Sequence, residues 1–373
     1  MHKSPLKILI YRIGSLGDTI IALPVFNKIR EVYPDADITL LTNQPINSKA
    51  PALESVLGKH HYFNRVINYP SGSRSPKVLY NVWKQILSLK VDIAINLATT
   101  KMLKDLGSTK MAVLRDKLFL FSAGFPRLMG FPKTLRDYML IPNPQTGEHE
   151  WEAERLVRRF KVLGDIPLDQ DRYWDMHFST QEQQLADEAL STLDKSKPIL
   201  AVSVGTKMPS KDWEQSNWIA LLEKLKKSFS DWQLVILGSP EEAERSELCL
   251  STWGGSGVNL CGKTSPRVSG AILKKARLFI GHDSGPMHLA AAAGAPCVAI
   301  FAARALPRHW FPRGDNNTII YHKTDCAGCG VEVCIEQKKK CILSITVDEV
   351  YQTATDMVNK TAAKYNNAFT GNN

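Results

Sequence analysis

Residues 281–294, Gly281-His-Asp-Ser-Gly-Pro-Met-His-Leu-Ala-Ala-Ala-Ala-Gly294, decide how the second half of this chain folds. One apolar run, Ala276–Ile280, precedes this stretch, and another, Pro296–Phe301, follows it. Pro286 suits the first position of a helix, where its missing N–H costs nothing, and Gly294 suits the C-terminal cap. The pattern therefore predicts a strand, a tight turn, a small-residue helix and a second strand.

The turn of this unit is a candidate phosphate site. A helix start leaves N–H groups without intrahelical partners, here chiefly those of Met287 and His288, and it carries the positive end of the helix dipole. Ser284 adds a hydroxyl, and Gly285 lets a ligand approach the backbone closely. This combination is typical of phosphate binding. The alternative is an ordinary strand–helix–strand crossover whose alanines only permit close packing.

Strands and helices alternate in both halves of the chain. This alternation predicts an α/β fold with parallel sheets covered on both faces. We expect strands at 7–13, 38–42, 62–69, 91–96, 198–204, 232–237, 277–280 and 297–301, and helices at 19–32, 78–89, 152–163, 216–229, 240–250, 267–275 and 346–364. Two facing doubly wound, Rossmann-like domains would place a ligand cleft at the carboxyl ends of both sheets. The expected divisions are 1–175, 176–345, and a C-terminal helix and tail at 346–373.

Length and composition indicate a globular protein of two domains. The chain has 373 residues, of which 44% are hydrophobic and 23% charged. The longest apolar stretch, around 289–303, contains Gly294 and Pro296 and is too short to span a membrane. The N-terminal apolar run is interrupted by Arg12, which argues against a signal peptide. We therefore expect a cytoplasmic protein.

The net charge of +10 predicts an anionic partner. Part of the excess is local, because residues 101–137 hold eight Lys and Arg against three Asp: Lys101, Lys104, Lys110, Arg115, Lys117, Arg127, Lys133 and Arg136. These cations are interleaved with Leu118–Phe121 and Phe125. Basic and apolar residues together favour an anionic amphiphile or a membrane surface, and a solvated face is the alternative. Nothing else in the chain indicates nucleic-acid binding.

The loop Gly14-Ser15-Leu-Gly17-Asp18 joins the first strand to the first helix. It is not a P-loop, because no Lys and Ser/Thr pair follows Gly17, and it lacks the third glycine of a dinucleotide-binding loop. A carboxylate at the carboxyl edge of a sheet is well placed to act as a general base. Asp18 could equally be a helix N-cap.

Three further segments follow strands of the second half. Lys211, in Lys211-Asp-Trp213, could neutralise a diphosphate, and Glu242 could accept hydrogen bonds from ribose hydroxyls. The alternatives are a solvated loop lysine for Lys211 and an ordinary acidic first helical turn for Glu242. Residues 257–264 match the P-loop spacing, but their centre is predicted to be a strand, which argues against a true P-loop. The end of this segment, Gly262, Lys263 and Thr264, could still contact a base or a ribose.

A cluster of cysteines lies near the C-terminus, with the spacing Cys326-x2-Cys329-x4-Cys334-x6-Cys341. In a cytosolic chain, a four-cysteine zinc site is chemically reasonable, although this is not the spacing of paired C-x2-C zinc ribbons. Reduced thiols or a redox-labile disulfide are the alternatives.

Four stretches together resemble glycosyltransferase family 9, the heptosyltransferases of lipopolysaccharide inner-core assembly. They are Ile8–Pro24 (ILIYRIGSLGDTIIALP), Tyr33–Leu41 (YPDADITLL), Lys211-Asp-Trp213, and Asp283–Ala291 (DSGPMHLAA). The resemblance extends from residue 7 to about residue 350. Two features depart from the family pattern: a longer basic and apolar stretch at 101–131, and the cysteine-rich tail.

The resemblance implies a GT-B fold and an inverting, metal-independent glycosyltransferase. It implies ADP-heptose, held mainly by the C-terminal domain, as the donor, and no required cofactor. Asp18 matches the catalytic base, Lys211 the phosphate-binding lysine and Glu242 a ribose contact, and the diphosphate and sugar loop comprises Asp283, Ser284, Gly285, Pro286, Met287 and His288. We expect the acceptor to meet Gly14, Ser15, Gly17, Lys101, Lys104, Lys110 and Arg115.

The expected acceptor is a lipopolysaccharide core or a related anionic, lipid-linked glycan. It would be reached by peripheral contact with the cytoplasmic leaflet of the membrane. Two alternatives stay open: a nucleotide-sugar epimerase of the same two-domain architecture, and a transferase that uses another nucleotide-sugar donor.

Overall fold

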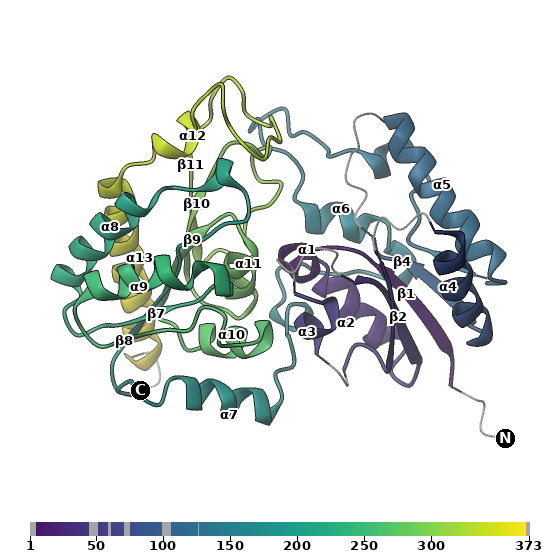
Figure 1. Ribbon diagram of the computed structural model, residues 1–373, viewed down its shortest axis with the longest axis horizontal. Coiled ribbons are helices and arrows are strands. Elements are labelled where there is room, and N and C mark those ends of the chain that lie inside the picture. The colour runs from purple at the N-terminus through teal and green to yellow at the C-terminus, as the bar shows by residue number, and fades with distance from the viewer. Residues whose placement is uncertain are drawn as a thin grey trace. The chain divides into compact units, whose positions relative to one another are not determined.

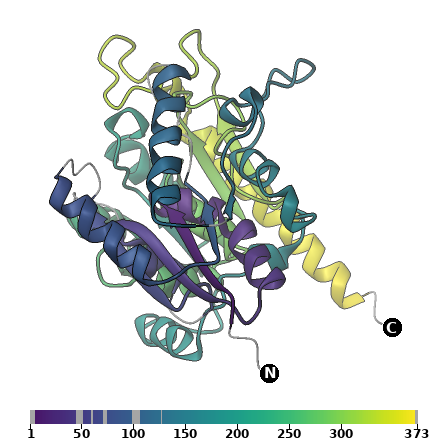
Figure 2. The ribbon, with the colours of Figure 1, turned by 90° about the vertical axis from the view of Figure 1, so that its right-hand side faces the viewer.

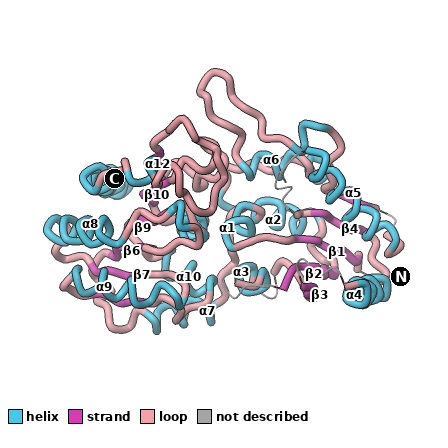
Figure 3. Tube along the Cα trace, turned by 45° about the horizontal axis from the view of Figure 1, so that its top comes forward, coloured by secondary structure: helices cyan, strands magenta, loops and turns pink. Residues whose placement is uncertain are grey.

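The computed structural model describes residues 5–44, 51–58, 61–70, 75–98, 106–125 and 127–370. The chain divides into two compact units, unit 1 (Met1–His177) and unit 2 (Phe178–Asn373), each with its own sheet. In both units the strands run between helices (Figures 1 and 3).

The described part of unit 1 holds a five-stranded sheet with the order β3-β2-β1-β4-β5, and every pairing is parallel. The strands are β1 (Lys7–Arg12), β2 (Asp37–Gln44), β3 (Arg65–Pro70), β4 (Ile93–Asn96) and β5 (Leu128–Met129). The central strand, β1, is buried from Ile8 to Arg12, as a strand covered on both faces requires. The four strands expected in this half are confirmed, with shifted ends.

Helices cover both faces of this sheet. On one face, Val82, Ile86 and Leu120 of α4 and α5 pack against Leu9 and Tyr11 of β1. The two helices, blue in Figure 2, lie beside the purple strands of this sheet. The helices are α1 (Leu16–Ile21), α2 (Leu23–Val32), α3 (Leu53–Leu57), α4 (Pro76–Ser88), α5 (Leu106–Ser122) and α6 (Glu152–Arg158), with short 3-10 turns at Leu135–Tyr138, Lys161–Leu163 and Asp171–Tyr173.

The single helix expected over 19–32 is wrong. Two helices, α1 and α2, occupy this region and meet at Ala22, which ends one and caps the other. Pro24 has no N–H to donate to the carbonyl of Ile20, so the hydrogen-bond ladder is interrupted there. Pro24 instead lies in the first turn of α2, where no donor is needed. The break makes α1 short, and α1 starts at Leu16, before Asp18 rather than after it.

The described part of unit 2 holds a six-stranded sheet with the order β11-β10-β9-β6-β7-β8, again parallel throughout. The strands are β6 (Ile199–Ser203), β7 (Gln233–Ile236), β8 (Gly257–Asn259), β9 (Leu278–His282), β10 (Cys297–Phe301) and β11 (Asn317–Tyr321). The strand expected at 297–301 is confirmed with the same ends. A strand, β8, lies within the string that mimics a P-loop, but it covers the first three residues of that string rather than its centre.

Helices α8, α9 and α13 lie on one face of this sheet, and α10 and α11 lie on the other (Figure 1). The helices are α7 (Thr180–Ala189), α8 (Gln215–Ser228), α9 (Ala243–Trp253), α10 (Pro266–Leu273), α11 (Gly285–Ala292), α12 (Lys340–Leu343) and α13 (Val347–Thr370), with 3-10 turns η4 (Pro209–Lys211) and η5 (Pro240–Glu242). The longest helix, α13, packs into the core of unit 2 through Val350, Ala354 and Met357. None of the described helices is both long enough and apolar enough to cross a membrane.

Candidate functional site

The carboxyl edge of the unit 2 sheet gathers the segments that the sequence singled out. Asp283 follows β9, and Lys211 ends the loop after β6. Glu242 lies in the turn after β7, and Gly262 lies in the turn after β8. Since β9, β6, β7 and β8 are neighbours in one parallel sheet, all four segments leave the same edge. Ligands of open α/β sheets bind at this edge.

Lys211 and Asp283 form an ion pair at this edge. The lysine Nζ lies 2.7 Å from Asp283 Oδ2 and donates to the Asp283 backbone carbonyl at 2.9 Å. The side chains of Lys211 and Asp283 are 14% and 4% exposed, so solvent screens the pair weakly. Asp283 therefore holds the ammonium group of Lys211 beside the start of α11.

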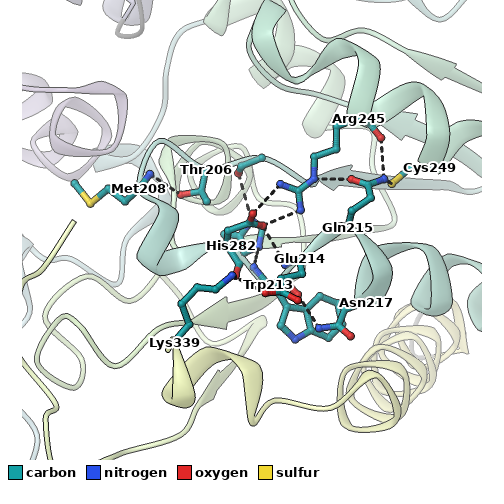
Figure 4. A network of polar contacts seen from close by, with 12 residues as sticks. Thr206, Met208, Trp213, Glu214, Gln215, Asn217, Arg245, Cys249, His282 and Lys339 are labelled. Carbon is teal, nitrogen blue, oxygen red and sulfur yellow. Dashed lines mark hydrogen bonds and ion pairs between the residues drawn. The ribbon is translucent and has the colours of Figure 1, made fainter. Parts of the chain in front are cut away.

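Trp213 and His282 fix the loop that carries Lys211. The Trp213 backbone N–H donates to His282 Nε2 at 3.1 Å, and His282 Nδ1 lies 3.3 Å from the Gly205 carbonyl (Figure 4). Nε2 accepts a hydrogen bond, so the imidazole carries its proton on Nδ1. Burial lowers the pKa of His282 to about 4, which keeps the ring neutral. This single tautomer ties the loop after β6 to the end of β9.

Asp212 extends the same network toward α9. Its carboxylate accepts from Arg245 at 2.7 and 3.1 Å, and Arg245 also donates to Gln215 (Figure 4). Lys339 contacts the Asp212 carbonyl at 3.1 Å and Glu214 at 2.8 Å. The sequence patterns did not identify His282, Arg245 or Lys339 as part of the site. They come from separate segments of the chain, and only the fold brings them together.

The first turn of α11 differs slightly from the expectation. The helix begins at Gly285, with Ser284 as N-cap and Pro286 in its first turn, and Gly294 follows the C-cap with a φ of +88°. The first intrahelical bond runs from the His288 N–H to the Ser284 carbonyl at 3.4 Å. The N–H of His288 was therefore wrongly expected to be free, and the donors that precede this bond are those of Gly285 and Met287.

One hydroxyl group and one carboxyl group complete this edge. Within the described part of the chain, Ser284 Oγ is buried and has no hydrogen-bond partner. Glu242 accepts from the Ser239 N–H at 2.9 Å, and burial raises the pKa of its carboxyl group. A Cβ at Gly205 or Gly238 would collide with the Glu242 side chain in its present position, so the two glycines leave room for this carboxylate.

The turn after β8 lies next to the turn that carries Glu242. Gly262 has a φ of +72°, and its N–H donates to the Gly238 carbonyl at 3.0 Å. Lys263 is exposed, and Thr264 Oγ1 lies 2.7 Å from Ser269 Oγ. The turn thus presents Lys263 to solvent at the same edge as Glu242.

In unit 1, Asp18 is the third residue of α1 and is buried. Its Oδ2 accepts from the Ser15 N–H at 2.8 Å and from the Ser15 hydroxyl at 2.7 Å. A Cβ at Gly14 would meet the Cβ of Asp18 at 2.7 Å, which explains the glycine there, and Gly17 is buried in the same helix. Asp18 therefore stabilises the helix start, and any catalytic role is additional to this structural one.

The expected acceptor cations are only partly visible. Lys110 and Arg115 lie exposed on α5, where Arg115 pairs with Asp116 at 2.7 Å. Lys101 and Lys104 lie outside the described residues.

The cysteine cluster is not assembled into a metal site. All four cysteines carry free thiols: Cys326, Cys329, Cys334 and Cys341. Burial raises the pKa of Cys341, and Cys326 and Cys334 are near enough to add to the shift. Among the residues that the structure describes, no three His, Cys, Asp or Glu side chains are arranged to hold a metal ion.

Comparison with known proteins agrees with the resemblance. The model of glycosyltransferase family 9 (heptosyltransferase) matches residues 109–340. The lipooligosaccharide heptosyltransferase 2 of Campylobacter jejuni is 24% identical over 362 residues, covering 95% of this chain and 98% of its own. The lipopolysaccharide heptosyltransferase 3 of Escherichia coli K12 is 24% identical, covering 77% of this chain and 80% of its own.

Solved structures show the same fold. A family 9 glycosyltransferase from Veillonella parvula aligns with a TM-score of 0.69 at 18% identity, covering 96% of this chain and 99% of its own. The E. coli ADP-heptose lps heptosyltransferase II aligns with a TM-score of 0.65 at 17% identity, covering 96% and 100%. The fold is therefore GT-B, built from two parallel-sheet α/β units. Together with the family match, this shows that the chain belongs to glycosyltransferase family 9, the heptosyltransferase family, and is a glycosyltransferase.

Proposed function

We propose that this protein transfers heptose from ADP-heptose to a lipopolysaccharide core or a related anionic glycan, with inversion at the anomeric carbon and without a metal ion. The observation that carries the proposal is the Lys211–Asp283 ion pair at the start of α11. The family match and the relatives named as heptosyltransferases support the choice of sugar.

We infer the site of the nucleotide sugar from N–H and O–H groups that remain available to a ligand. Lys211 has three N–H donors, and its two recorded contacts are both with Asp283, so one donor remains for a phosphate oxygen. Ser284 Oγ and the first N–H groups of α11 point to the same ligand chemistry. We assign the diphosphate to these groups, the ribose to Glu242, and the base or ribose to the Gly262–Thr264 turn.

The acceptor reaction is assigned to unit 1. Asp18 takes the proton of an acceptor hydroxyl while that oxygen attacks the anomeric carbon of the donor sugar. The bond from this carbon to the diphosphate breaks, and its electron pair leaves with ADP. Lys211 and the start of α11 meet the negative charge that develops on the diphosphate, which is the task that a metal ion performs in other transferases.

The outer face of α5 supports peripheral membrane contact from the cytoplasmic side. Met111, Leu114, Leu118 and Phe121 recur at helical spacing and are between 46% and 67% exposed. The opposite face of α5 packs into the core through Leu120 and its neighbours, so this helix is apolar on two sides.

Cations flank the exposed stripe of α5. At 100° per residue, Lys110 and Lys117 lie on one side of it and Arg115 on the other. An interfacial helix buries such a stripe at the headgroup level while its cations contact anionic lipids. The proposed acceptor is lipid-linked, so this contact would bring the enzyme to its substrate.

Replacing Lys211 with Ala should weaken ADP binding. A hydrogen bond to a charged group is worth about 1.5–3 kcal/mol, so we expect affinity to fall roughly 10- to 100-fold by isothermal titration. Lys275→Ala, which removes an exposed lysine of unit 2 paired with Asp187, is the matched control. Because Lys211→Ala leaves Asp283 unpaired, the double variant with Asp283→Asn checks folding. Unchanged ADP affinity in Lys211→Ala would refute the assignment.

Replacing Asp18 with Asn should abolish most transfer while preserving the fold. The amide oxygen can still accept from Ser15, but it cannot take a proton, so the rate should fall by about 10²- to 10⁴-fold. Asp137→Asn is the control, since Asp137 accepts from the Thr134 N–H at 2.9 Å at another helix start of unit 1. Near-normal turnover in Asp18→Asn, measured as ADP release with acceptor, would reduce Asp18 to a structural residue.

Reversing the α5 cations should release the protein from anionic vesicles. Each cation near such a surface adds about 1 kcal/mol, so Lys110, Arg115 and Lys117 together changed to Glu should abolish sedimentation with phosphatidylglycerol vesicles and raise the acceptor KM. Polar substitution of Leu118 and Phe121 should weaken binding that persists in high salt. The charge-matched control changes Lys224, Lys227 and Lys275 of unit 2. If the α5 variant keeps both vesicle binding and acceptor KM, α5 is only a solvated face.

A further inference from the structure

Arg159 is anchored at the carboxyl end of β4 in unit 1. It directly follows α6, and its Nη2 donates to the Ala98 carbonyl at 3.0 Å. Arg12 donates to the Leu97 carbonyl at 2.6 Å and also to the backbone carbonyl of Asp18. Arg159 contacts the segment that follows β4, and Asp18 lies in the helix that follows β1. Since β4 pairs directly with β1, the two residues lie at neighbouring strand ends of one sheet.

The guanidinium of Arg159 keeps two unused donors. Its Nε and Nη1 atoms are buried, and neither has a hydrogen-bond partner in the described part of the chain. The neighbouring arginines are satisfied by carboxylates. Arg155 makes two bonds to Glu152, at 2.7 and 2.6 Å, and Arg158 makes two to Glu150, at 2.6 and 2.8 Å.

This arrangement destabilises the protein unless a ligand completes it. A buried donor without a partner costs about 1–3 kcal/mol. Burial, with a further contribution from Arg155, lowers the pKa of Arg159 to about 9, against the opposing effect of Glu152. An oxyanion at Nε and Nη1 would satisfy both donors and would further favour the charged form of the guanidinium.

We propose that Arg159 binds an acidic group of the acceptor glycan, a carboxylate or a phosphate, and so holds the acceptor beside Asp18. The inference rests on the proposed function in one respect, the assignment of the acceptor to unit 1. Arg159 was not among the acceptor residues expected from the sequence, and it follows α6, whereas the exposed cations lie on α5.

Kinetics with Arg159→Met test the assignment to the acceptor. Losing a charge-assisted contact should raise the acceptor KM roughly 10- to 100-fold, with kcat changed much less and ADP affinity unchanged. Arg159→Lys should recover little, because an ammonium group cannot reproduce the guanidinium donors. Arg158→Met is the control, and it should lower the melting temperature by breaking the Glu150 contacts, whereas Arg159→Met should not. An unchanged acceptor KM in Arg159→Met would overturn the proposal.

Binding without turnover separates this inference from the identity of the donor. With ADP at saturation to occupy unit 2, inorganic phosphate and glucuronate are titrated at constant ionic strength, and thermal stability is measured. At least one anion should stabilise the unsubstituted protein with a saturable curve, and Arg159→Met should lose that response. The anion that acts identifies the acidic group as phosphate or carboxylate. No stabilisation, or the same stabilisation in Arg159→Met, would contradict the site even if ADP-heptose proves to be the donor.

Discussion

The Lys211–Asp283 ion pair is the interaction on which the proposed chemistry of unit 2 depends. It joins the loop after β6 to the loop after β9, and buried groups beside it hold both loops in register. Trp213 reaches His282 through its backbone N–H, while its ring packs in the core. A neutral, buried imidazole is suited to this task, because it donates on one side and accepts on the other without adding charge. The cation at the proposed phosphate site is thus positioned before any ligand arrives, which would lower the entropic cost of binding.

In unit 1, the same side chains stabilise the fold and carry the proposed chemistry. Asp18 completes the start of α1 with Ser15, so the carboxylate is already oriented by two hydrogen bonds. Arg12 ties the backbone of this helix to the end of β4, where Arg159 is also anchored. The stability of the fold and the proposed positioning of a base therefore depend on the same residues. Such overlap explains why the helix-cap and general-base interpretations of Asp18 are compatible rather than exclusive.

Much of the fold could be predicted from local sequence, because buried parallel strands read as apolar runs. The strand at 297–301 has the predicted ends, and the doubly wound alternation holds in both units. Pro24 was the local signal that the predicted helix 19–32 overlooked. Helix α5 was not predicted, since apolar residues on two of its faces hide the usual helical period. Lys211, Asp283 and Asp18 were found as motif residues, whereas Arg245 and Arg159 matter through contacts between distant segments, which no local pattern reveals.

Acceptor-dependent release of ADP from ADP-heptose tests the central claim most directly. The purified protein is incubated with ADP-heptose, with and without a lipopolysaccharide core acceptor, and both ADP and the anomeric configuration of the glycan product are measured. The account predicts that ADP forms only when the acceptor is present and that the new linkage has the inverted configuration. Equal ADP release without acceptor, a retained configuration, or turnover of another nucleotide sugar in place of ADP-heptose would contradict it.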